Sequence, residues 1–189
     1  MDIAVAKAEA RSAAFARRRA ARLALGPAPQ AATEAALAAL LARPEGVIAG
    51  YVPIRTEIDP RPLMTRLHEA GRRLCVPVIE APGRPLAFRE WAPDAEMVEG
   101  PFGAAVPASG AWLTPGALIA PLVAFDAGLL RLGYGGGFYD RTLALLQADG
   151  GPGAYALGLA YAAQQAEALP AEPTDRPLNA IATEAGLLT

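Results

Sequence analysis

The chain has 189 residues, of which 53% are hydrophobic and 19% are charged, and its formal net charge is −2. This length fits one compact domain, and the single cysteine, Cys75, excludes a disulfide framework and a cysteine-based zinc cluster. The near-neutral charge argues against a dedicated nucleic-acid-binding protein. No signal peptide and no bilayer-spanning run of about 18 apolar residues is recognised, so we expect a soluble cytoplasmic protein.

Two helices are predicted at the start of the chain. Residues 2–24 are rich in Ala, Arg and Leu, and the helix is expected to end at Gly26-Pro27. Residues 30–42 form the second predicted helix. Its buried stripe is expected to consist of Leu37, Leu40 and Leu41.

The next segments alternate between apolar runs and a helix. Residues 47–52 are continuously apolar, as expected for a strand that is buried on both faces. Asp59-Pro60 is a helix-start signal, so a helix is predicted from there to Ala70. Residues 74–79 form the second predicted strand.

The second half of the chain begins with a stretch rich in Pro and Gly, residues 80–116, in which only a short strand at 86–90 is predicted. The remaining predicted elements are strands at 118–125, 154–160 and 180–183 and a helix at Tyr139–Gln147, which follows a glycine-rich loop. Helices that alternate with apolar strands indicate an α/β fold with a mostly parallel sheet and helices on both faces.

The glycine-rich loop after the strand at 118–125 is the most informative segment for function. It contains Gly133, Gly135, Gly136 and Gly137, with Arg131 before them and Asp140 at the exit. Closely spaced glycines let backbone amides approach an anion, and the following helix start adds partial positive charge. Arg131 supplies a charge for phosphate oxygens, and Asp140 a carboxylate for Mg²⁺. No Walker A or plain dinucleotide-binding pattern is present.

Other charged residues have competing interpretations. Asp126 could chelate a metal, but turn formation in Phe-Asp-Ala-Gly is favoured. The arginines of residues 17–22 could form a nucleic-acid patch, but a charge run on a helix is usually a solvated face. Lys7 is the one lysine among 17 basic residues, and composition alone favours an incidental exposed side chain.

The segment 131–141, Arg-Leu-Gly-Tyr-Gly-Gly-Gly-Phe-Tyr-Asp-Arg, resembles the signature of the 5-formyltetrahydrofolate cyclo-ligase family, also called 5,10-methenyltetrahydrofolate synthetase. Three further segments are similar to that family in the same order: Lys7–Arg11, Tyr51–Asp59 and Leu169–Asp175, the last leading into Glu184. The resemblance therefore covers nearly the whole chain. It implies one cyclo-ligase domain over residues 1–189, of the CoA-transferase-like type.

The resemblance also implies roles for individual residues. Mg²⁺ would be bound by Asp140 and Asp175. The reduced folate would be contacted by Val52, Glu57, Phe102 and Tyr139. ATP would be bound by Lys7, Arg11, Arg131, Leu132, Gly133, Tyr134, Gly135, Gly136, Gly137, Phe138 and Tyr139.

The reaction that the resemblance implies begins when ATP phosphorylates the formyl oxygen of 5-formyltetrahydrofolate. N10 then attacks the activated carbon, phosphate leaves, and 5,10-methenyltetrahydrofolate remains. The partners would be ATP and a reduced folate, with no nucleic acid and no membrane, and the protein would be a monomer. Two alternatives stay open: a non-catalytic nucleotide-binding module, and an ATP-dependent enzyme of the same fold that acts on another substrate.

Overall fold

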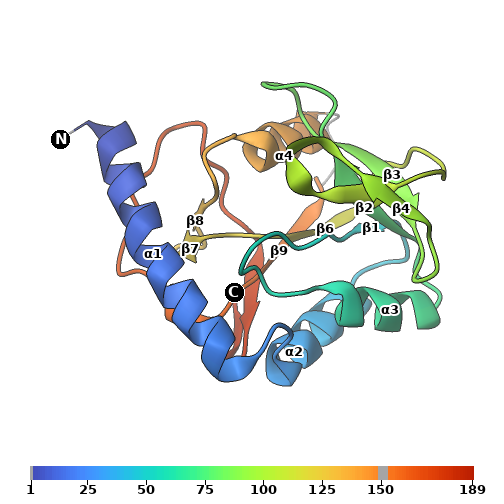
Figure 1. The fold of residues 1–189 in the computed structure, drawn as a ribbon, viewed down its shortest axis with the longest axis horizontal. Helices are drawn as coiled ribbons and strands as arrows, with labels where there is room; N and C mark the ends of the chain where they lie inside the picture. The colour runs from blue at the N-terminus through green and yellow to red at the C-terminus, as the bar shows by residue number, and fades with distance from the viewer. Residues whose placement is uncertain (1, 149–152) are drawn as a thin grey trace.

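The computed structural model describes residues 2–148 and 153–189. Within these residues, seven strands form one sheet at the centre of the molecule (Figure 1). In spatial order they are β11 (Gly186–Leu188), β10 (Ala180–Thr183), β9 (Tyr155–Leu159), β6 (Ala117–Ala120), β1 (Ile48–Ala49), β2 (Leu74–Val78) and β3 (Ala87–Trp91). The five inner strands pair in parallel, and the two outer strands are antiparallel to their neighbours. The predicted mostly parallel sheet is confirmed.

Helices cover both faces of this sheet, as predicted. On one face lie α2 (Gln30–Leu41) and α3 (Arg61–Glu69), and on the other lies α4 (Phe138–Ala148) (Figure 1). Successive residues of β6 alternate between the two layers: Ile119 packs in the cluster that includes α2 and α3, and Leu118 in the cluster that includes α4. Burial on both faces explains why the inner strands are continuously apolar in sequence.

Helix α1 (Ile3–Leu25) lies along the side of the molecule, against the 3-10 turn Ala162–Gln164 and a small two-stranded ladder (Figure 1). The carboxylate of Asp2 caps its first turn by accepting a hydrogen bond of 3.0 Å from the backbone amide of Ala4. Gly26 ends it with a positive φ of 79°, which favours glycine. None of the helices in the described part of the chain is long and apolar enough to cross a membrane.

The structure corrects four predicted elements. The predicted strand at 118–125 is divided into β6 and β7 (Ala124–Phe125), and β7 pairs with β8 (Arg131–Leu132) outside the main sheet. Pro121 lies at the break, where it has no amide hydrogen to donate to a ladder. The stretch 80–116 is more regular than expected, because a hairpin of β4 (Met97–Glu99) and β5 (Ala105–Pro107) encloses the 3-10 turn Pro101–Gly103.

The other two corrections concern the limits of predicted features. The strand expected over residues 47–52 is regular only at Ile48–Ala49. Leu41 was expected in the buried stripe of α2 but is 41% exposed, because it is the last helical residue and the chain from 42 to 46 runs over the surface. Strand β11, at the end of the chain, was not predicted.

Candidate functional site

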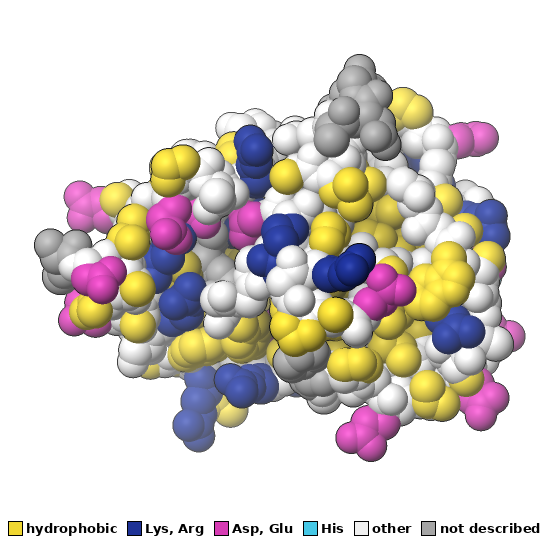
Figure 2. Space-filling view, turned by 90° about the horizontal axis from the view of Figure 1, so that it is seen from above, with side chains coloured by type: hydrophobic (Ala, Val, Ile, Leu, Met, Phe, Trp, Pro, Cys, Tyr) yellow, Lys and Arg dark blue, Asp and Glu magenta, His cyan; other side chains and the backbone are white. Residues whose placement is uncertain are grey.

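A cavity of about 870 Å³ lies where α1, the loop after β1, the β4–β5 hairpin and the glycine loop meet. Lys and Arg side chains gather in the middle of the upper face, as Figure 2 shows. Every predicted site residue whose side chain is described lines this one cavity. The set comprises Lys7, Arg11, Val52, Glu57, Arg131, Leu132, Gly133, Tyr134, Gly135, Gly136, Gly137, Phe138, Tyr139, Asp140 and Asp175.

The glycine loop connects β8 to the first turn of α4 and is held by two arginines. Gly135 and Gly137 have positive φ angles of 100° and 65°, a conformation that residues with a side chain rarely adopt. The Arg11 guanidinium donates to the carbonyl oxygen of Gly133 at 2.8 Å, and that of Arg141 donates to Gly136 at 2.7 Å. Carbonyl oxygens of the loop are thereby occupied by cations from α1 and α4.

Two ion pairs connect the predicted phosphate-binding cations to the predicted metal-binding carboxylates. The Nζ atom of Lys7 donates to Asp175 at 2.7 Å and to Glu172 at 2.6 Å. The Arg131 guanidinium donates to Asp140 at 2.9 Å, and its other nitrogen donates to the carbonyl oxygen of Arg176 at 2.7 Å. Within the described structure, the cations of this corner of the cavity are therefore balanced by carboxylates.

Burial and hydrogen bonding act in opposite directions on the Lys7 pair. Burial alone lowers the pKa of Lys7, but the hydrogen bonds that Lys7 donates to Asp175 and Glu172 outweigh it, so the pKa is raised. For Asp175 burial raises the pKa, and the hydrogen bonds from Lys7 and from the backbone amide of Glu172 outweigh it, so the pKa is lowered. Both groups are held in their charged forms. Lys7 is only 8% exposed, so the expectation of an incidental surface lysine is wrong.

The carboxylates of Asp140 and Asp175 are the residues here that suit a divalent cation. The backbone amide of Arg176, the residue after Asp175, donates to the Asp140 carboxylate at 3.0 Å, which brings the two segments together. Mg²⁺ is commonly held by one or two carboxylates, with phosphate oxygens and water completing the octahedron. The pair fits that pattern, and in the described residues no cluster of three or more His, Cys, Asp or Glu offers a protein-only cage.

Glu57 is a buried carboxylate that lines the same cavity and is only 4% exposed. The backbone amide of Ile54 donates to it at 2.8 Å, which closes the turn after β1. Burial raises its pKa, and the Ile54 amide, Arg18, Tyr134 and Arg55 counteract that rise in part. Asp59 was expected to cap the next helix, but Pro60 is the N-cap of α3; the Asp59 carboxylate accepts from the Arg61 amide at 3.0 Å, beside the start of that helix.

Tyr139 has a buried hydroxyl oxygen that finds no hydrogen-bond partner among the described residues. Its pKa is raised first by burial and then by the nearby Glu57. Buried polar atoms are normally paired, so an orphan hydroxyl in a cavity wall is suited to a bound molecule. For Phe102 the structure describes the backbone in the 3-10 turn; its predicted contact involves a side chain outside the described part.

The arginines of α1 correct another expectation, because most of them do not form a solvated face. Arg18 is 0% exposed, and Arg17 and Arg22 donate to the carbonyl oxygens of Ala163 at 2.9 Å and Glu57 at 2.7 Å. Only Arg19 of this run is exposed. The role of Arg18 was missed because an arginine run carries no local sign of which member faces inward.

Glu172 was also missed, and Asp126 was interpreted correctly. Glu172 precedes Asp175 by three residues, and that second acidic residue was the available signal for a shared partner. Asp126 accepts hydrogen bonds from the amides of Gly128, Leu130 and Leu169 at 2.9, 3.1 and 3.2 Å. Its carboxylate therefore builds a turn, as expected.

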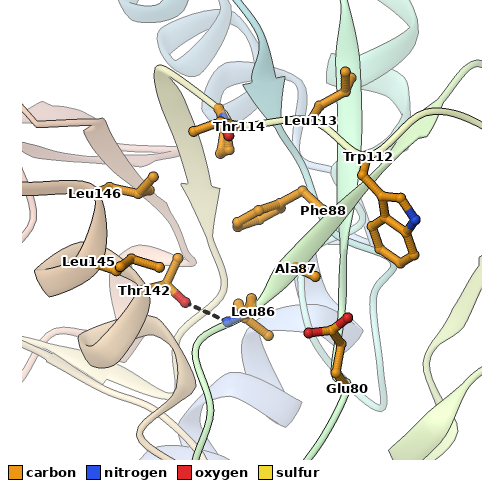
Figure 3. A pocket seen from close by; sticks show the side chains of 11 residues that line it. Glu80, Leu86, Ala87, Phe88, Trp112, Leu113, Thr114, Thr142, Leu145 and Leu146 are labelled. Atoms are coloured by element: carbon orange, nitrogen blue, oxygen red, sulfur yellow. Dashed lines mark hydrogen bonds between the residues drawn. The ribbon is translucent and has the colours of Figure 1, made fainter. Parts of the chain in front are cut away.

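A second cavity of about 520 Å³ lies between α4 and β3 and is mainly apolar (Figure 3). Leu86 lines both cavities, and its backbone amide donates to the Thr142 hydroxyl at 2.9 Å. This contact ties α4, which begins at the glycine loop, to the chain entering β3. None of the predicted site residues lines the second cavity, so the site chemistry belongs to the larger one.

Comparisons with known proteins identify the family. Residues 4–184 match the model of the 5-formyltetrahydrofolate cyclo-ligase family. The 5-formyltetrahydrofolate cyclo-ligase of Escherichia coli (strain K12) is 36% identical over 143 residues, 72% of this chain and 76% of that protein. The one from Haemophilus influenzae is 36% identical over 157 residues, 80% of this chain and 82% of that protein.

Solved structures agree. The NMR structure of Aquifex aeolicus 5,10-methenyltetrahydrofolate synthetase aligns with a TM-score of 0.72 at 26% identity, covering 96% of this chain and 91% of that one. The synthetase from Mycoplasma pneumoniae shares the fold with a TM-score of 0.70 at 23% identity, covering 97% and 99%. The chain belongs to the 5-formyltetrahydrofolate cyclo-ligase family.

Proposed function

We propose that this member of the 5-formyltetrahydrofolate cyclo-ligase family converts 5-formyltetrahydrofolate and ATP into 5,10-methenyltetrahydrofolate, ADP and phosphate. The observation that carries the proposal is the convergence of distant motifs on one cavity. Lys7, Glu57, the glycine loop and Asp175 come from four separate parts of the sequence, and all of them line it. A fold-level likeness alone would leave the chemistry open, whereas this arrangement provides phosphate-binding and substrate-binding groups side by side.

The first step transfers the γ-phosphoryl group of ATP to the formyl oxygen on N5. Catalysis of such a transfer consists mainly of positioning and of neutralising charge on the phosphoryl oxygens. Lys7, Arg11 and Arg131 supply fixed positive charge at one end of the cavity, beside the backbone amides of the glycine loop. Lys7 and Arg131 exchange their carboxylate partners for phosphate oxygens when the nucleotide binds.

The second step takes place at the folate end of the cavity. The lone pair of N10 attacks the activated carbon, N10 loses its proton, and the C–O bond breaks as phosphate leaves. Glu57 is the buried acceptor available to the N–H groups of the pterin, and Val52 supplies an apolar contact in the same wall. Tyr139 also lines the cavity, and its buried hydroxyl has no hydrogen-bond partner among the described residues.

Asp140 and Asp175 are the residues that would hold Mg²⁺ together with the nucleotide phosphates. The ion would neutralise charge on the phosphate oxygens. The chain's own contribution is to keep the Asp175 carboxylate ionised: burial raises its pKa, but the hydrogen bonds from Lys7 and the Glu172 amide outweigh burial and lower it.

The same proposal treats residues 1–189 as one cyclo-ligase domain that works as a cytoplasmic monomer. ATP is available in the cytoplasm, and the free, buried Cys75 suits a reducing compartment.

Purified protein mixed with 5-formyltetrahydrofolate, ATP and Mg²⁺ is expected to produce the absorbance of methenyltetrahydrofolate. Omission of ATP should abolish the rise. A folded sample that binds ATP without any rise would indicate the non-catalytic module instead. Turnover of ATP with another N-formyl heterocycle, but not with this folate, would indicate a different substrate.

A further inference from the structure

Arg18 of α1 is a buried arginine that joins three separate segments. Its side chain is 0% exposed. It donates to the Thr56 hydroxyl at 3.0 Å, to the carbonyl oxygen of Leu122 at 3.2 Å and to the Tyr134 hydroxyl at 2.7 Å. These acceptors belong to the turn after β1, the chain between β6 and β7, and the glycine loop. The planar guanidinium fork can reach all three at once, which an ammonium cannot.

One of these contacts, together with one from Arg22, fixes the turn that carries Glu57. Thr56 immediately precedes Glu57, and Arg22, one helical turn after Arg18, donates to the Glu57 carbonyl oxygen at 2.7 Å. Helix α1 therefore donates hydrogen bonds to two successive residues of the turn, Thr56 and Glu57. The Ile54 amide completes the arrangement by binding the Glu57 carboxylate itself at 2.8 Å.

Tyr134 connects the same arginine to the nucleotide side of the cavity. Its hydroxyl accepts a hydrogen bond from Arg18 at 2.7 Å, and Tyr134 also lies near the Glu57 carboxylate, whose pKa it lowers. The guanidinium carbon atoms of Arg18 and Arg55 both lie 5.5 Å from the centre of its ring. Tyr134 is 38% exposed and lines the cavity, while its hydroxyl is hydrogen-bonded to Arg18.

We propose that Arg18 is a positioning residue, which fastens the Glu57 turn to the glycine loop through the Tyr134 hydroxyl and so holds the Glu57 carboxylate in place for the reduced folate. This proposal rests on the proposed function of the cavity. Under this proposal the glycine loop serves both substrates. Its backbone faces the phosphates of ATP, and Tyr134, the tyrosine between its glycines, helps to hold the Glu57 carboxylate that binds the folate.

The contacts among Arg18, Thr56, Tyr134 and Glu57, here called the Arg18 network, can be followed through the pKa of Glu57. Burial raises the pKa of Glu57, while Arg18 from α1, Arg55 from its own turn and Tyr134 from the glycine loop lower it. Tyr51 and Tyr139 also face it. Loss of the Tyr134 hydroxyl or of the Arg18 fork removes a lowering influence, so the pKa of Glu57 should rise further.

The experiment compares Arg18→Lys, Tyr134→Phe and the double variant with wild type. Tyr155→Phe, on β9, is a matched control for loss of a tyrosine hydroxyl. The Michaelis constant for 5-formyltetrahydrofolate should rise roughly five- to tenfold in each single variant, as expected when a charge-assisted hydrogen bond is lost, with kcat nearly unchanged. The double variant should be no worse than the more impaired single one, because both act through one network.

A second readout needs neither substrate. NMR titration of the Glu57 carboxyl group in the ligand-free protein should show a higher pKa in Tyr134→Phe than in wild type and Tyr155→Phe. An unchanged carboxyl pKa, or effects on the Michaelis constant that simply add, would overturn the network. A shifted carboxyl pKa in a protein whose wild type has no turnover would instead refute the proposed function and leave the network standing. Tyr134→Phe keeps this test available if Arg18→Lys fails to fold.

Discussion

The glycine loop and helix α1 both bring positive charge to the same cavity, but they hold that charge in different ways. In the loop, Arg131 pairs with Asp140, a residue only nine positions later. In the helix, the partners of Lys7 lie 165 and 168 positions away, and the acceptor of Arg11 lies 122 away. The loop segment balances its own charge, whereas the helix contributes cations that are fixed only after the chain has folded.

The loop cation is therefore positioned by a residue of its own segment, whereas the α1 cations are positioned by tertiary contacts. Damage to the loop should affect the reaction and leave the fold largely unchanged, because its ion pair is made within one segment. Damage to α1 should affect ligand affinity, stability or both, depending on which residue is changed. The following substitutions test that separation.

Asp140→Asn should have the largest effect. The amide keeps an oxygen that can accept from Arg131 and the Arg176 backbone, but it removes the charge proposed to face Mg²⁺. We expect kcat to fall by about 100-fold or more, as for loss of one preorganised electrostatic group in an active site. Asp94→Asn, on the exposed surface, is the control. Activity within about threefold of wild type would reject the metal assignment.

Lys7→Arg should have the next largest effect and should appear in affinity. Lys7 fits between two carboxylates at 2.6 and 2.7 Å with little exposed surface, and the wider guanidinium cannot take the same position. We expect the Michaelis constant for ATP to rise about tenfold, with the fold retained. Arg19→Lys makes the reverse exchange on the exposed side of the same helix, and it should change neither the Michaelis constant for ATP nor the fold. Equal ATP affinity in Lys7→Arg and wild type would show that any cation suffices.

The contrast between loop and helix also explains how far the sequence could lead. Residues 131–141 were predicted as a phosphate-binding loop, because four closely spaced glycines between Arg131 and Asp140 are visible within eleven letters. The ion pair that joins Arg131 to Asp140 was not predicted. The parallel sheet was predictable for a similar reason, since continuous apolar runs indicate strands that are buried on both faces. Arg18 was not predictable, because its acceptors lie 38, 104 and 116 residues away and it resembles the exposed Arg19 beside it. The hairpin of β4 and β5 was hidden by Pro and Gly residues that proved to be its ends and turn.

Arg22→Ala should reduce stability moderately. Its guanidinium donates to the Glu57 carbonyl oxygen, and it lies in the last turn of α1, where a cation also interacts favourably with the helix dipole. We expect the free energy of unfolding to fall by about 1 kcal/mol, the usual net value of one such hydrogen bond. Urea denaturation of Arg22→Ala beside Arg19→Ala measures this difference. Equal stability of the two variants would show that α1 is not fastened at Arg22.

The smallest effect should be a pH-dependent one from the Lys7–Asp175 pair. The pKa of Asp175 is lowered from its ordinary value of 3.8, so its contribution to stability is present above that value and is lost as the pH falls through the lower, folded value. The pKa of Lys7 is raised above 10.5, so its contribution is lost only at pH values above that. Lys7→Met should therefore melt below wild type at pH 7, by roughly 1 to 3 °C, as expected for an ion pair whose carboxylate remains partly exposed. The difference should shrink as the pH falls below 3.8 and through the lowered pKa of Asp175, because protonation of Asp175 removes the charge that pairs with Lys7. A difference that stays constant until the wild type itself unfolds in acid would mean that Lys7 stabilises α1 by packing, and that its ion pair with Asp175 contributes nothing measurable to stability.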